Sequence, residues 1–498
     1  MRETRRFLAF DLGAESGRAV VGSIKEDRLA LTEIYRFPTG GTKINNHLYW
    51  DVLGFYSQLL AGLKKYVSEY GSDLDGIGVD AWGVDFGLLD KRGNLLGNPY
   101  HYRDAKNEGT MAIIDKKLGL RELYNLTGIQ LLQINTVNQL VAMVRDEDPL
   151  LPAAENILFI GDLFHYFFTG VKAVEHTVAS ISQLYNTVTD DWEKKVFAAL
   201  GIPSKITTRL IRAGDVIGPL KGELAEEVGL NEVPVIAPAV HDTASAAVAV
   251  PAVEDEGWAF LNSGTWSIVG LELDSPVIND RSYEMNISNS GGAFNRILYL
   301  KNVMGLWIIQ CCKRIWNKKH PSLSYQEIAS LAQGAAPFVA FIDPDDPAFL
   351  NPVDATAAVA AYCCRTGQAE VDKDDIGTIS RIVFESLALK YRYVLERLME
   401  ATGSKVKVLH ITGGGSNNEL LNEFTASALG IKVTAGPVEA TAIGNIMLQA
   451  TGAGLYRSLP EIRRIIRNSF EIKEYLPEER EVWEKAYERF VRIIEEKG

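Results

Sequence analysis

Residues 9–16 read Ala-Phe-Asp-Leu-Gly-Ala-Glu-Ser, and residues 260–267 read Phe-Leu-Asn-Ser-Gly-Thr-Trp-Ser. When Gly13 is aligned with Gly264, each copy has a short apolar strand, a tight glycine turn and then a second apolar strand. This repetition indicates two similar domains, with the second beginning near residue 254. Two similar domains that face each other would form a cleft, which is a common place for a ligand.

The rest of the chain alternates short apolar runs with longer amphipathic segments, a pattern typical of α/β layers in which helices cover sheets. Several short apolar runs predict buried strands, and several longer segments have apolar residues at helical spacing. The predicted strands are Phe7–Phe10, Gly76–Val79, Val233–Ala237, Trp258–Leu261 and Val406–Ile411; the predicted helices are 51–68, 376–401 and 418–429. The acidic stretch 254–257 is predicted to be an exposed link. We expect domains at 1–250 and 251–470 and a helical tail at 471–498.

The composition of the 498 residues, 47% hydrophobic and 23% charged, excludes a wholly disordered chain. The formal net charge of −13 argues against general binding of nucleic acid or of an anionic membrane. It leaves a phosphate ligand possible, because backbone N–H groups can hold one locally. Neither a P-loop nor the dinucleotide-binding glycine fingerprint occurs in the sequence.

Four cysteines occur as two adjacent pairs, Cys311–Cys312 and Cys363–Cys364. This is neither a disulfide framework nor the spacing of a zinc site, so we expect reduced thiols and a cytoplasmic protein. The first pair is expected to be buried.

The longest uncharged run, 123–144, is too polar for a membrane span. We expect a monomer or a homodimer.

The glycine turns are candidate phosphate sites. A turn rich in Gly, Ser and Thr presents consecutive backbone N–H groups, which can cradle phosphate oxygens. Residues 11–18 and 263–267 fit this description, although both could be plain hairpin turns. The loop 412–418 follows a predicted strand and precedes a helix, the general arrangement for binding an anion at a helix N-terminus. Alternatively, the loop 412–418 only connects the strand to the helix.

A candidate general base lies in the segment 238–247, where an apolar strand ends and a helix of small residues begins. Asp242, at the rim of a cleft, could accept a proton from an attacking hydroxyl. Alternatively, Asp242 or Thr243 could simply cap the helix. His241 alone is more often structural than catalytic.

A candidate polyol site follows another predicted strand, at Trp82-Gly83-Val84-Asp85-Phe86, with Tyr102-Arg103-Asp104 nearby in the sequence. Aromatic faces and carboxylates beside an arginine suit the recognition of a polyol. The alternative is that Trp82 is part of the core.

Together, and in this order, these motifs resemble the FGGY carbohydrate kinases and, within that family, the rhamnulokinases. The resemblance extends over nearly the whole chain. It is carried by Asp11-Leu12-Gly13 with Ser16-Gly17-Arg18, the segments at 82–86, 102–104, 241–246 and 263–267, Lys301-Asn302-Val303-Met304-Gly305-Leu306-Trp307 with Gln310, the glycines 413–415 with Asn417, and Gly436-Pro437-Val438-Glu439-Ala440.

The resemblance implies two ribonuclease H-like domains of the actin-like ATPase kind, with the active site in the cleft between them. It implies transfer of phosphate from ATP, with Mg²⁺, to the C1 hydroxyl of L-rhamnulose. Asp242 would be the catalytic base and Asp11 would hold the hydrated metal. The implied sugar contacts are Gly83, His241, Asp242, Thr243 and Asn302; the implied ATP contacts are Ala14, Glu15, Ser16, Gly17, Arg18, Thr265, Gln310 and Gly414.

Two residues depart from the pattern of that family. Glu15 stands where a small hydroxyl residue would fit the family, and it adds negative charge beside the expected phosphates. Its side chain could point away from them or pair with Arg18. Ala81 stands where Thr is common, so L-fuculose or D-xylulose are alternative substrates. A non-catalytic nucleotide switch of the actin type shares the fold, but it would not need Asp242 and the sugar loops.

Overall fold

The computed structural model describes residues 4–253 and 257–496. Within these ranges the chain divides into two compact units, each assembled from three separate stretches. Unit 1 combines Met1–Ala249, Glu272–Tyr299 and Ala440–Ser469; unit 2 combines Val250–Leu271, Leu300–Glu439 and Phe470–Gly498. Residues 254–256 of the predicted link lie outside the described residues. The boundaries near 250 and 470 stay a prediction.

The central sheet of unit 1 has the order β13-β14-β6-β1-β2-β3. Strands β1 (Arg5–Leu12) and β2 (Ser16–Lys25) form the predicted hairpin, and β6 (Gly76–Ala81) runs parallel to β1. The remaining strands of this sheet are β3 (Arg28–Pro38), β13 (Val216–Pro219) and β14 (Pro234–Ile236). Parallel strands bring their carboxyl ends to one edge of the sheet, so β1 and β6 end side by side.

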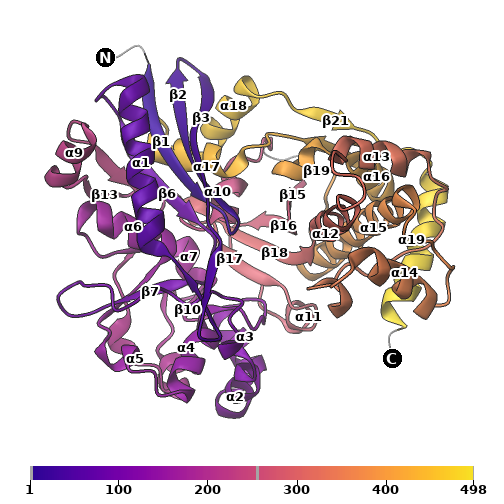
Figure 1. Cartoon of the computed structure of the whole chain (residues 1–498), viewed down its shortest axis with the longest axis horizontal. Helices are drawn as coiled ribbons and strands as arrows, with labels where there is room; N and C mark the ends of the chain where they lie inside the picture. Colours follow the sequence, from indigo (N-terminus) through magenta and orange to yellow (C-terminus); the bar gives the residue numbers. More distant parts are fainter. Residues whose placement is uncertain (1–3, 254–256, 497–498) are drawn as a thin grey trace. The chain divides into compact units, whose positions relative to one another are not determined.

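Helices cover both faces of this sheet. Successive residues of a strand point to opposite faces, so each strand contacts helices on both sides. On one face, Gly62 of α1 (Val52–Tyr70) lies so close to Phe10 that a Cβ would be 2.8 Å from its ring. On the other face, a Cβ at Gly78 would lie 2.7 Å from Asn445 of α17 (Ala440–Gly452). Figure 1 shows α1 and α17 on the two sides of the strands.

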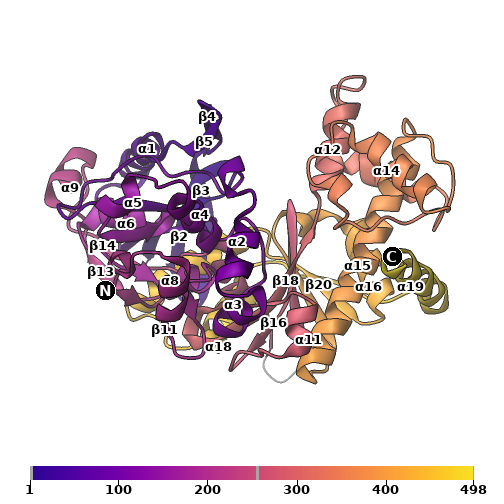
Figure 2. The ribbon, with the colours of Figure 1, turned by 90° about the horizontal axis from the view of Figure 1, so that it is seen from below.

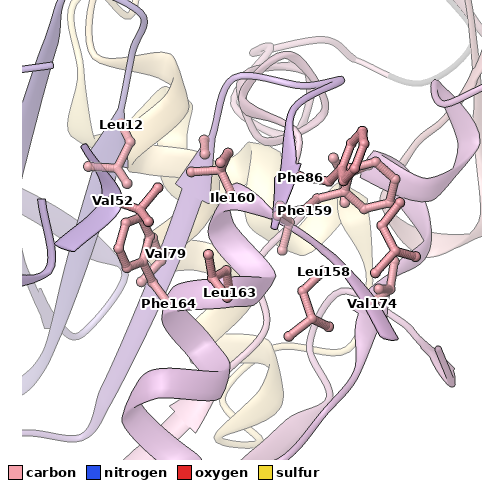
Figure 3. Close-up of a cluster of buried hydrophobic side chains, with 14 of the residues drawn as sticks. Leu12, Val52, Val79, Phe86, Leu158, Phe159, Ile160, Leu163, Phe164 and Val174 are labelled. Atoms are coloured by element: carbon pink, nitrogen blue, oxygen red, sulfur yellow. The ribbon is translucent and has the colours of Figure 1, made fainter. Parts of the chain in front are cut away.

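The hydrophobic core of unit 1 continues from the face of α1 to α6 (Ile160–Thr169). Figure 3 shows Val79 of β6 beside Phe164 and Leu163 of α6, with Leu12 and Val52 next to them. Burial of such side chains contributes roughly 1.5–3 kcal/mol each. The core therefore anchors the ends of β1 and β6, where the candidate site residues begin.

The backbones of α10 (Asp242–Val248) and α17 pack against each other directly. A Cβ at Gly444 would lie 1.8 Å from the carbonyl oxygen of Ser245, so only glycine permits this approach. The small residues predicted in the helix after Asp242 thus serve to bring α17 close.

A second sheet, whose central strands β15 and β19 belong to unit 2 and whose edge strand β17 belongs to unit 1, repeats the pattern of the first. β15 (Trp258–Ser263) and β16 (Trp266–Leu273) form an antiparallel hairpin, and β19 (Val408–Thr412) runs parallel to β15. The strand order is β17-β18-β16-β15-β19-β20-β21, with β17 (Ser288–Gly291), β18 (Ile297–Met304), β20 (Lys432–Ala435) and β21 (Lys473–Tyr475). Helices α15 (Ile376–Thr402), α16 (Glu419–Leu429) and α19 (Arg480–Glu495) lie side by side in unit 2 (Figure 2).

The other elements complete the two units. The helices are α2 (Thr110–Lys117), α3 (Leu120–Thr127), α4 (Thr136–Arg145), α5 (Leu150–Ala153), α7 (His176–Ser180), α8 (Lys194–Leu200), α9 (Gly222–Val228), α11 (Asp280–Glu284), α12 (Trp307–Trp316), α13 (Tyr325–Gly334), α14 (Ala355–Arg365) and α18 (Leu459–Ser469). The strands are β4 (Gly41–Ile44), β5 (His47–Trp50), β7 (Phe86–Leu89), β8 (Asn156–Phe159), β9 (Val174–Glu175), β10 (Tyr185–Asn186), β11 (Asp191–Trp192) and β12 (Leu210–Ile211).

The predicted strands and helices are confirmed within a few residues at their ends. The predicted α/β class is confirmed as well. Of the predicted tail, Lys473–Tyr475 form β21 and Arg480–Glu495 form α19. The four cysteines are free thiols, and both Cys311 and Cys312 are buried as predicted. Within the described ranges, no helix has the length and apolar character needed to cross a membrane.

Candidate active site

The first glycine hairpin, between β1 and β2, carries an ion pair at its base. Asp11 and Arg18 are register partners, and Arg18 Nε and Nη2 donate to Asp11 Oδ2 at 3.0 and 2.7 Å. The turn closes with Gly13 N–H donating to the carbonyl of Ser16 at 3.0 Å. The side chain of Glu15 is exposed, and Arg18 pairs with Asp11 instead. Ala14 and Ser16 are half-buried, while Gly17 lies against Phe37.

A second carboxylate, Asp80, stands next to Asp11 on the parallel strand β6. The two residues are register partners and so point to the same face of the sheet. Asp80 is fully buried; its Oδ2 accepts from Asn445 Nδ2 at 2.5 Å, and its Oδ1 has no hydrogen-bond partner among the described residues. Burial and the charge of Asp11 raise the pKa of Asp80 well above its ordinary value. Asp80 was not among the predicted site residues, although an acidic residue directly after the predicted strand 76–79 was the available signal.

Asp242 is the first residue of α10, and its side chain is 32% exposed. His241 occupies the N-cap position of this helix, without a side-chain cap hydrogen bond, so the alternative that Asp242 or Thr243 is the N-cap is wrong. Asp242 Oδ1 accepts from Thr243 N–H at 2.6 Å and from Thr243 Oγ1 at 3.2 Å. Burial, and then the negative charge of Asp11, raise the pKa of Asp242 to about 7. A carboxylate with that pKa is well matched to accepting a proton at neutral pH.

His241 and Gly83 lie beside this carboxylate. His241 Nε2 is 3.4 Å from Asp242 Oδ1, and His241 Nδ1 has no hydrogen-bond partner within the part of the chain that is described. Burial lowers the pKa of His241 to about 4, so the ring is neutral near pH 7. A Cβ at Gly83 would lie 3.3 Å from the His241 ring and 2.1 Å from Ile181. The structure therefore brings together Gly83, His241, Asp242 and Thr243.

The predicted polyol loop has a different role for its aromatic and acidic members. Asp85 is fully buried, and it accepts from Trp50 Nε1 at 2.5 Å, Trp82 Nε1 at 3.0 Å and Gln139 Nε2 at 2.9 Å. Trp82 is only 6% exposed and its ring lies 4.1 Å from that of Trp50, centroid to centroid. The alternative interpretation of Trp82 as core is thus confirmed. Asp104 is also buried, and it accepts from Leu48 N–H at 2.5 Å.

In unit 2, the second glycine hairpin leads onto the N-terminus of α12. The carbonyl of Gly264 accepts from Leu306 N–H at 2.9 Å, and the carbonyl of Thr265 accepts from Trp307 N–H at 3.2 Å. Thr265 Oγ1 donates to Gln310 Oε1 at 3.3 Å, in the first turns of α12. Two predicted nucleotide contacts, Thr265 and Gln310, are therefore direct neighbours.

The glycine loop after β19 packs against the same hairpin. A Cβ at Gly415 would lie 2.0 Å from Ser263 Oγ, and Gly413 has a φ of +81°, a conformation that favours glycine. Gly414 is exposed, and a Cβ there would meet no atom within 4 Å. This open glycine surface beside Thr265 fits a flat or anionic ligand lying on the backbone, as a nucleotide would.

The predicted site residues thus form two groups. Unit 1 holds Asp11, the turn 14–18, Gly83 and the segment 241–243. Unit 2 holds Thr265, Asn302, Gln310 and Gly414, with Asn302 half-buried on β18. The cleft expected between the two domains stays a prediction.

A divalent cation fits the carboxylates of unit 1. Across the described ranges, no group of three or more His, Cys, Asp or Glu side chains could hold a metal ion by itself. Mg²⁺ does not need such a cage, because it keeps several waters and is bound by one or two carboxylates together with substrate phosphates. Asp11, with the unpartnered Oδ1 of Asp80 on the neighbouring strand, supplies that chemistry.

Comparison with known proteins places these features in a family. Residues 6–249 match the N-terminal domain, and residues 259–453 the C-terminal domain, of the FGGY family of carbohydrate kinases. A rhamnulokinase of Bacteroides thetaiotaomicron is 42% identical over 98% of this chain and 99% of its own length. A rhamnulokinase of Enterococcus faecalis is 38% identical over 95% of this chain and 94% of its own.

Solved structures agree in fold. A xylulose kinase of Lactobacillus acidophilus superposes with a TM-score of 0.82 at 15% identity, covering 98% of this chain and 97% of its own. A glycerol kinase of Plasmodium falciparum, solved with ADP, superposes with a TM-score of 0.79 at 15% identity, covering 98% of both chains. The two-domain fold of the actin-like ATPase kind is confirmed, and the chain belongs to the FGGY family of carbohydrate kinases.

Proposed function

We propose that this chain transfers the γ-phosphate of ATP to the C1 hydroxyl of L-rhamnulose, giving L-rhamnulose 1-phosphate and ADP in the breakdown of L-rhamnose. The observation that carries the chemistry is Asp242, a partly exposed carboxylate with a pKa near 7 beside His241 and Gly83. The choice of sugar is supported by relatives that are named rhamnulokinases and match the chain almost end to end.

In this mechanism the oxygen of the C1 hydroxyl forms a bond to the γ-phosphorus while Asp242 accepts the proton of that hydroxyl. The bond from the γ-phosphorus to the ADP oxygen breaks in the same step. We assign His241, Thr243 and Gly83 to the sugar, because His241 Nε2 lies 3.4 Å from Asp242 Oδ1 and Nδ1 of the same ring has no hydrogen-bond partner among the described residues. Asn302 is assigned to the sugar as well. Positioning and charge neutralisation supply most of the rate enhancement in phosphoryl transfer.

The nucleotide is assigned to the two glycine hairpins and to the loop around Gly414. Backbone N–H groups of 14–18 would face the phosphates, with Arg18 neutralising charge, while Thr265, Gln310 and Gly414 would contact the rest of the nucleotide. We assign Mg²⁺ to Asp11, where a bound cation would neutralise the transferring phosphoryl group. The proton acceptor and the cation ligand are then two different carboxylates of one unit.

We also assign the protein to the cytoplasm, where ATP is made and thiols stay reduced. This assignment agrees with four free cysteines, three of them buried.

A kinase assay coupled to ADP release, run over a panel of ketoses with ATP and Mg²⁺, tests the function. We expect the highest kcat/KM on L-rhamnulose, with a phosphorus–proton coupling at C1 in the product. A higher kcat/KM on L-fuculose or D-xylulose would overturn the proposed sugar. Binding of ATP without turnover of any ketose would overturn the kinase activity.

A further inference from the structure

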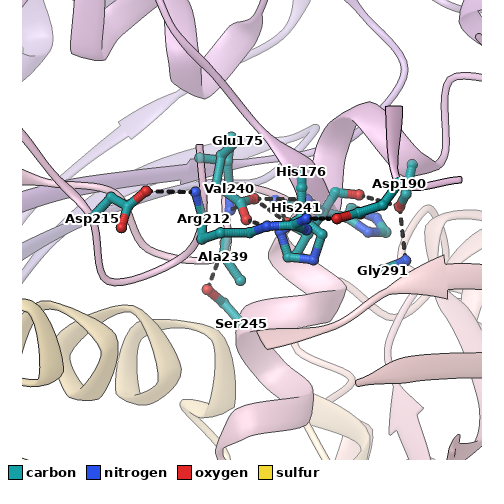
Figure 4. Close-up of polar contacts among 12 residues, drawn as sticks. Glu175, His176, Asp190, Arg212, Asp215, Ala239, Val240, His241, Ser245 and Gly291 are labelled. Atoms are coloured by element: carbon teal, nitrogen blue, oxygen red, sulfur yellow. Dashed lines mark hydrogen bonds and ion pairs between the residues drawn. The ribbon is translucent and has the colours of Figure 1, made fainter. Parts of the chain in front are cut away.

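Behind the loop that leads to Asp242 lies a fully buried acidic residue, Glu175, which the sequence analysis did not single out. Glu175 ends β9 and caps α7 (Figure 4). Its Oε2 accepts from Val240 N–H at 3.0 Å, and its Oε1 lies 2.7 Å from His176 Nδ1. The side chain is 0% exposed. One carboxylate oxygen thus holds the backbone two residues before Asp242.

Thr177 forms a second link between the same carboxylate and the same loop. Its backbone N–H donates to Glu175 Oε2 at 3.0 Å, and its hydroxyl donates to that oxygen through a short hydrogen bond. The hydroxyl oxygen also accepts from His241 N–H at 3.3 Å. The backbone N–H groups of Val240 and His241 are therefore both tied to one buried cluster.

The loop is fixed from its other sides as well. The carbonyl of Val240 accepts from Ala81 N–H at 2.9 Å, at the end of β6 and two residues from Gly83. The carbonyl of Ala239 accepts from Ser245 Oγ at 2.7 Å (Figure 4). Both polar backbone groups of Val240 are used, so a shift of the Glu175 carboxylate would be transmitted directly to His241 and Asp242.

The role of Glu175 as the cap of α7 does not by itself explain why its carboxylate is fully buried. Removing a carboxylate from water is strongly unfavourable, and only good hydrogen bonds or a countercharge offset that cost. Within the described ranges, no lysine or arginine forms an ion pair with Glu175, and the ring of His176 is its one basic contact. Its carboxylate is instead satisfied by donors, two of which belong to Val240 and Thr177. The buried carboxylate is thus directed at the loop that carries the site residues.

We propose that Glu175, acting with the hydroxyl of Thr177, is a positioning residue for phosphoryl transfer: it fixes the backbone of Val240 and His241 and so the direction in which His241 and Asp242 meet the sugar. This inference rests on the proposed role of Asp242 as the base. A displacement of about 1 Å in a reacting group can cost on the order of 100-fold in rate.

The test compares two variants that loosen the loop with two that do not. Glu175→Gln keeps the shape but removes the charge that strengthens the bonds from Val240 and Thr177. Thr177→Val removes the hydroxyl that accepts from His241, whereas Thr177→Ser keeps it. Ser180→Ala is the matched control: it lies on α7, is fully buried and loses bonds to Gly291 and to the Thr177 carbonyl, none of them in the loop.

Three quantities are measured for each variant: kcat with both KM values, the melting temperature, and amide hydrogen exchange of a peptide covering 239–243. We expect Glu175→Gln and Thr177→Val to lower kcat by about 10- to 100-fold, with KM for ATP unchanged. Exchange at positions 240 and 241 should rise several-fold, as expected for a weakened hydrogen bond. Thr177→Ser and Ser180→Ala should keep kcat within about twofold.

The inference is overturned if Glu175→Gln and Thr177→Val keep kcat within about twofold, even when exchange rises. It is equally overturned if Ser180→Ala loses as much kcat at the same fall in melting temperature, because the role would then be merely structural. Exchange needs no turnover, so unchanged exchange at 240 and 241 contradicts the inference independently of activity. A wild-type chain that phosphorylates no ketose contradicts the proposed function instead.

Discussion

The two glycine hairpins share one backbone plan but differ in charge. In unit 1, Asp11 pairs across the hairpin with Arg18 and in parallel register with Asp80. In unit 2, Asn262 stands at the position of Asp11; it pairs across the hairpin with Ile268 and in parallel register with Thr412. Two carboxylates in one unit are replaced by an amide and a hydroxyl in the other.

This difference indicates how one repeated scaffold can serve two purposes. Carboxylates repel phosphate but hold cations and accept protons, which suits the proposed role of unit 1 in the chemical step. Neutral groups beside an open glycine loop suit the binding of a polyanion through backbone N–H groups. Substitutions in the two units test this division.

Replacing Asp242 removes the proposed base from the charged unit. Asp242→Asn should keep the fold and the affinity for ATP but lower kcat by about 10²- to 10⁴-fold, the usual cost of losing a general base. Steady-state kinetics on L-rhamnulose measure kcat, and calorimetric titration with a non-hydrolysable ATP analogue measures the affinity for the nucleotide. A near-normal kcat would remove Asp242 from the mechanism.

Asp11→Asn makes the first hairpin resemble the second. Because it removes the proposed cation ligand, the Mg²⁺ concentration for half-maximal activity should rise by about 10- to 100-fold. Activity measured across a Mg²⁺ titration at saturating ATP provides the test. Asn262→Ala, which alters the corresponding position in unit 2, is the control and should leave the Mg²⁺ requirement unchanged.

The pH dependence of turnover should report the raised pKa of Asp242. A base acts only when deprotonated, so kcat/KM should fall about tenfold for each pH unit below that pKa. A bound Mg²⁺ would favour the carboxylate form of Asp242, so the midpoint is expected at or below the pKa of about 7. Rates from pH 5 to 8 at saturating Mg²⁺ provide the measurement. An acid limb that is unchanged in Asp242→Asn would assign it to another group.

Asn262→Asp makes the reverse exchange and places a carboxylate in the second hairpin. Negative charge near the proposed nucleotide site should raise KM for ATP by about tenfold, the effect of roughly 1.4 kcal/mol of repulsion. The KM for the sugar should not change. Asn262→Ala separates loss of the amide from gain of charge, and an equal KM in both variants would contradict the electrostatic explanation.

Glu15→Ser should have the smallest effect. The side chain is exposed and Arg18 is paired with Asp11, so the proposed phosphate contact at this turn is through the backbone. We expect KM for ATP to change by no more than about twofold. A larger decrease in KM would mean that the Glu15 carboxylate repels the phosphates.

Much of the fold follows from local patterns in the sequence. The runs 7–10 and 76–79 are apolar and short, and they form β1 and β6 almost where expected. The repeated glycine turn predicts two hairpins correctly, since the turn residues act within a few positions of each other. The order of the motifs identifies the family for the same reason: each motif is a contiguous segment.

The parts of the site that were missed depend on contacts between distant residues. Asp80 is informative only when β1 and β6 are in register, and Glu175 lies 65 positions from its partner Val240. The loop at 82–86 was interpreted as a sugar site because its composition suits one. Burial against Trp50 instead occupies Trp82 and Asp85 with internal bonds. A pattern of residue types does not reveal whether a polar atom is already paired.

The placement of α17 has a consequence for the order in which the protein is made. Asn445, which donates to Asp80, follows it by 365 residues, and Gly444, which lets α17 approach α10, stands beside Asn445. Until that stretch leaves the ribosome, the face of the first sheet that packs on α17 is incomplete and Asp80 lacks the amide of Asn445 as its donor. A nascent or truncated chain that ends before α17 is therefore expected to lack a finished first unit, which makes synthesis of α17 a precondition for the kinase site.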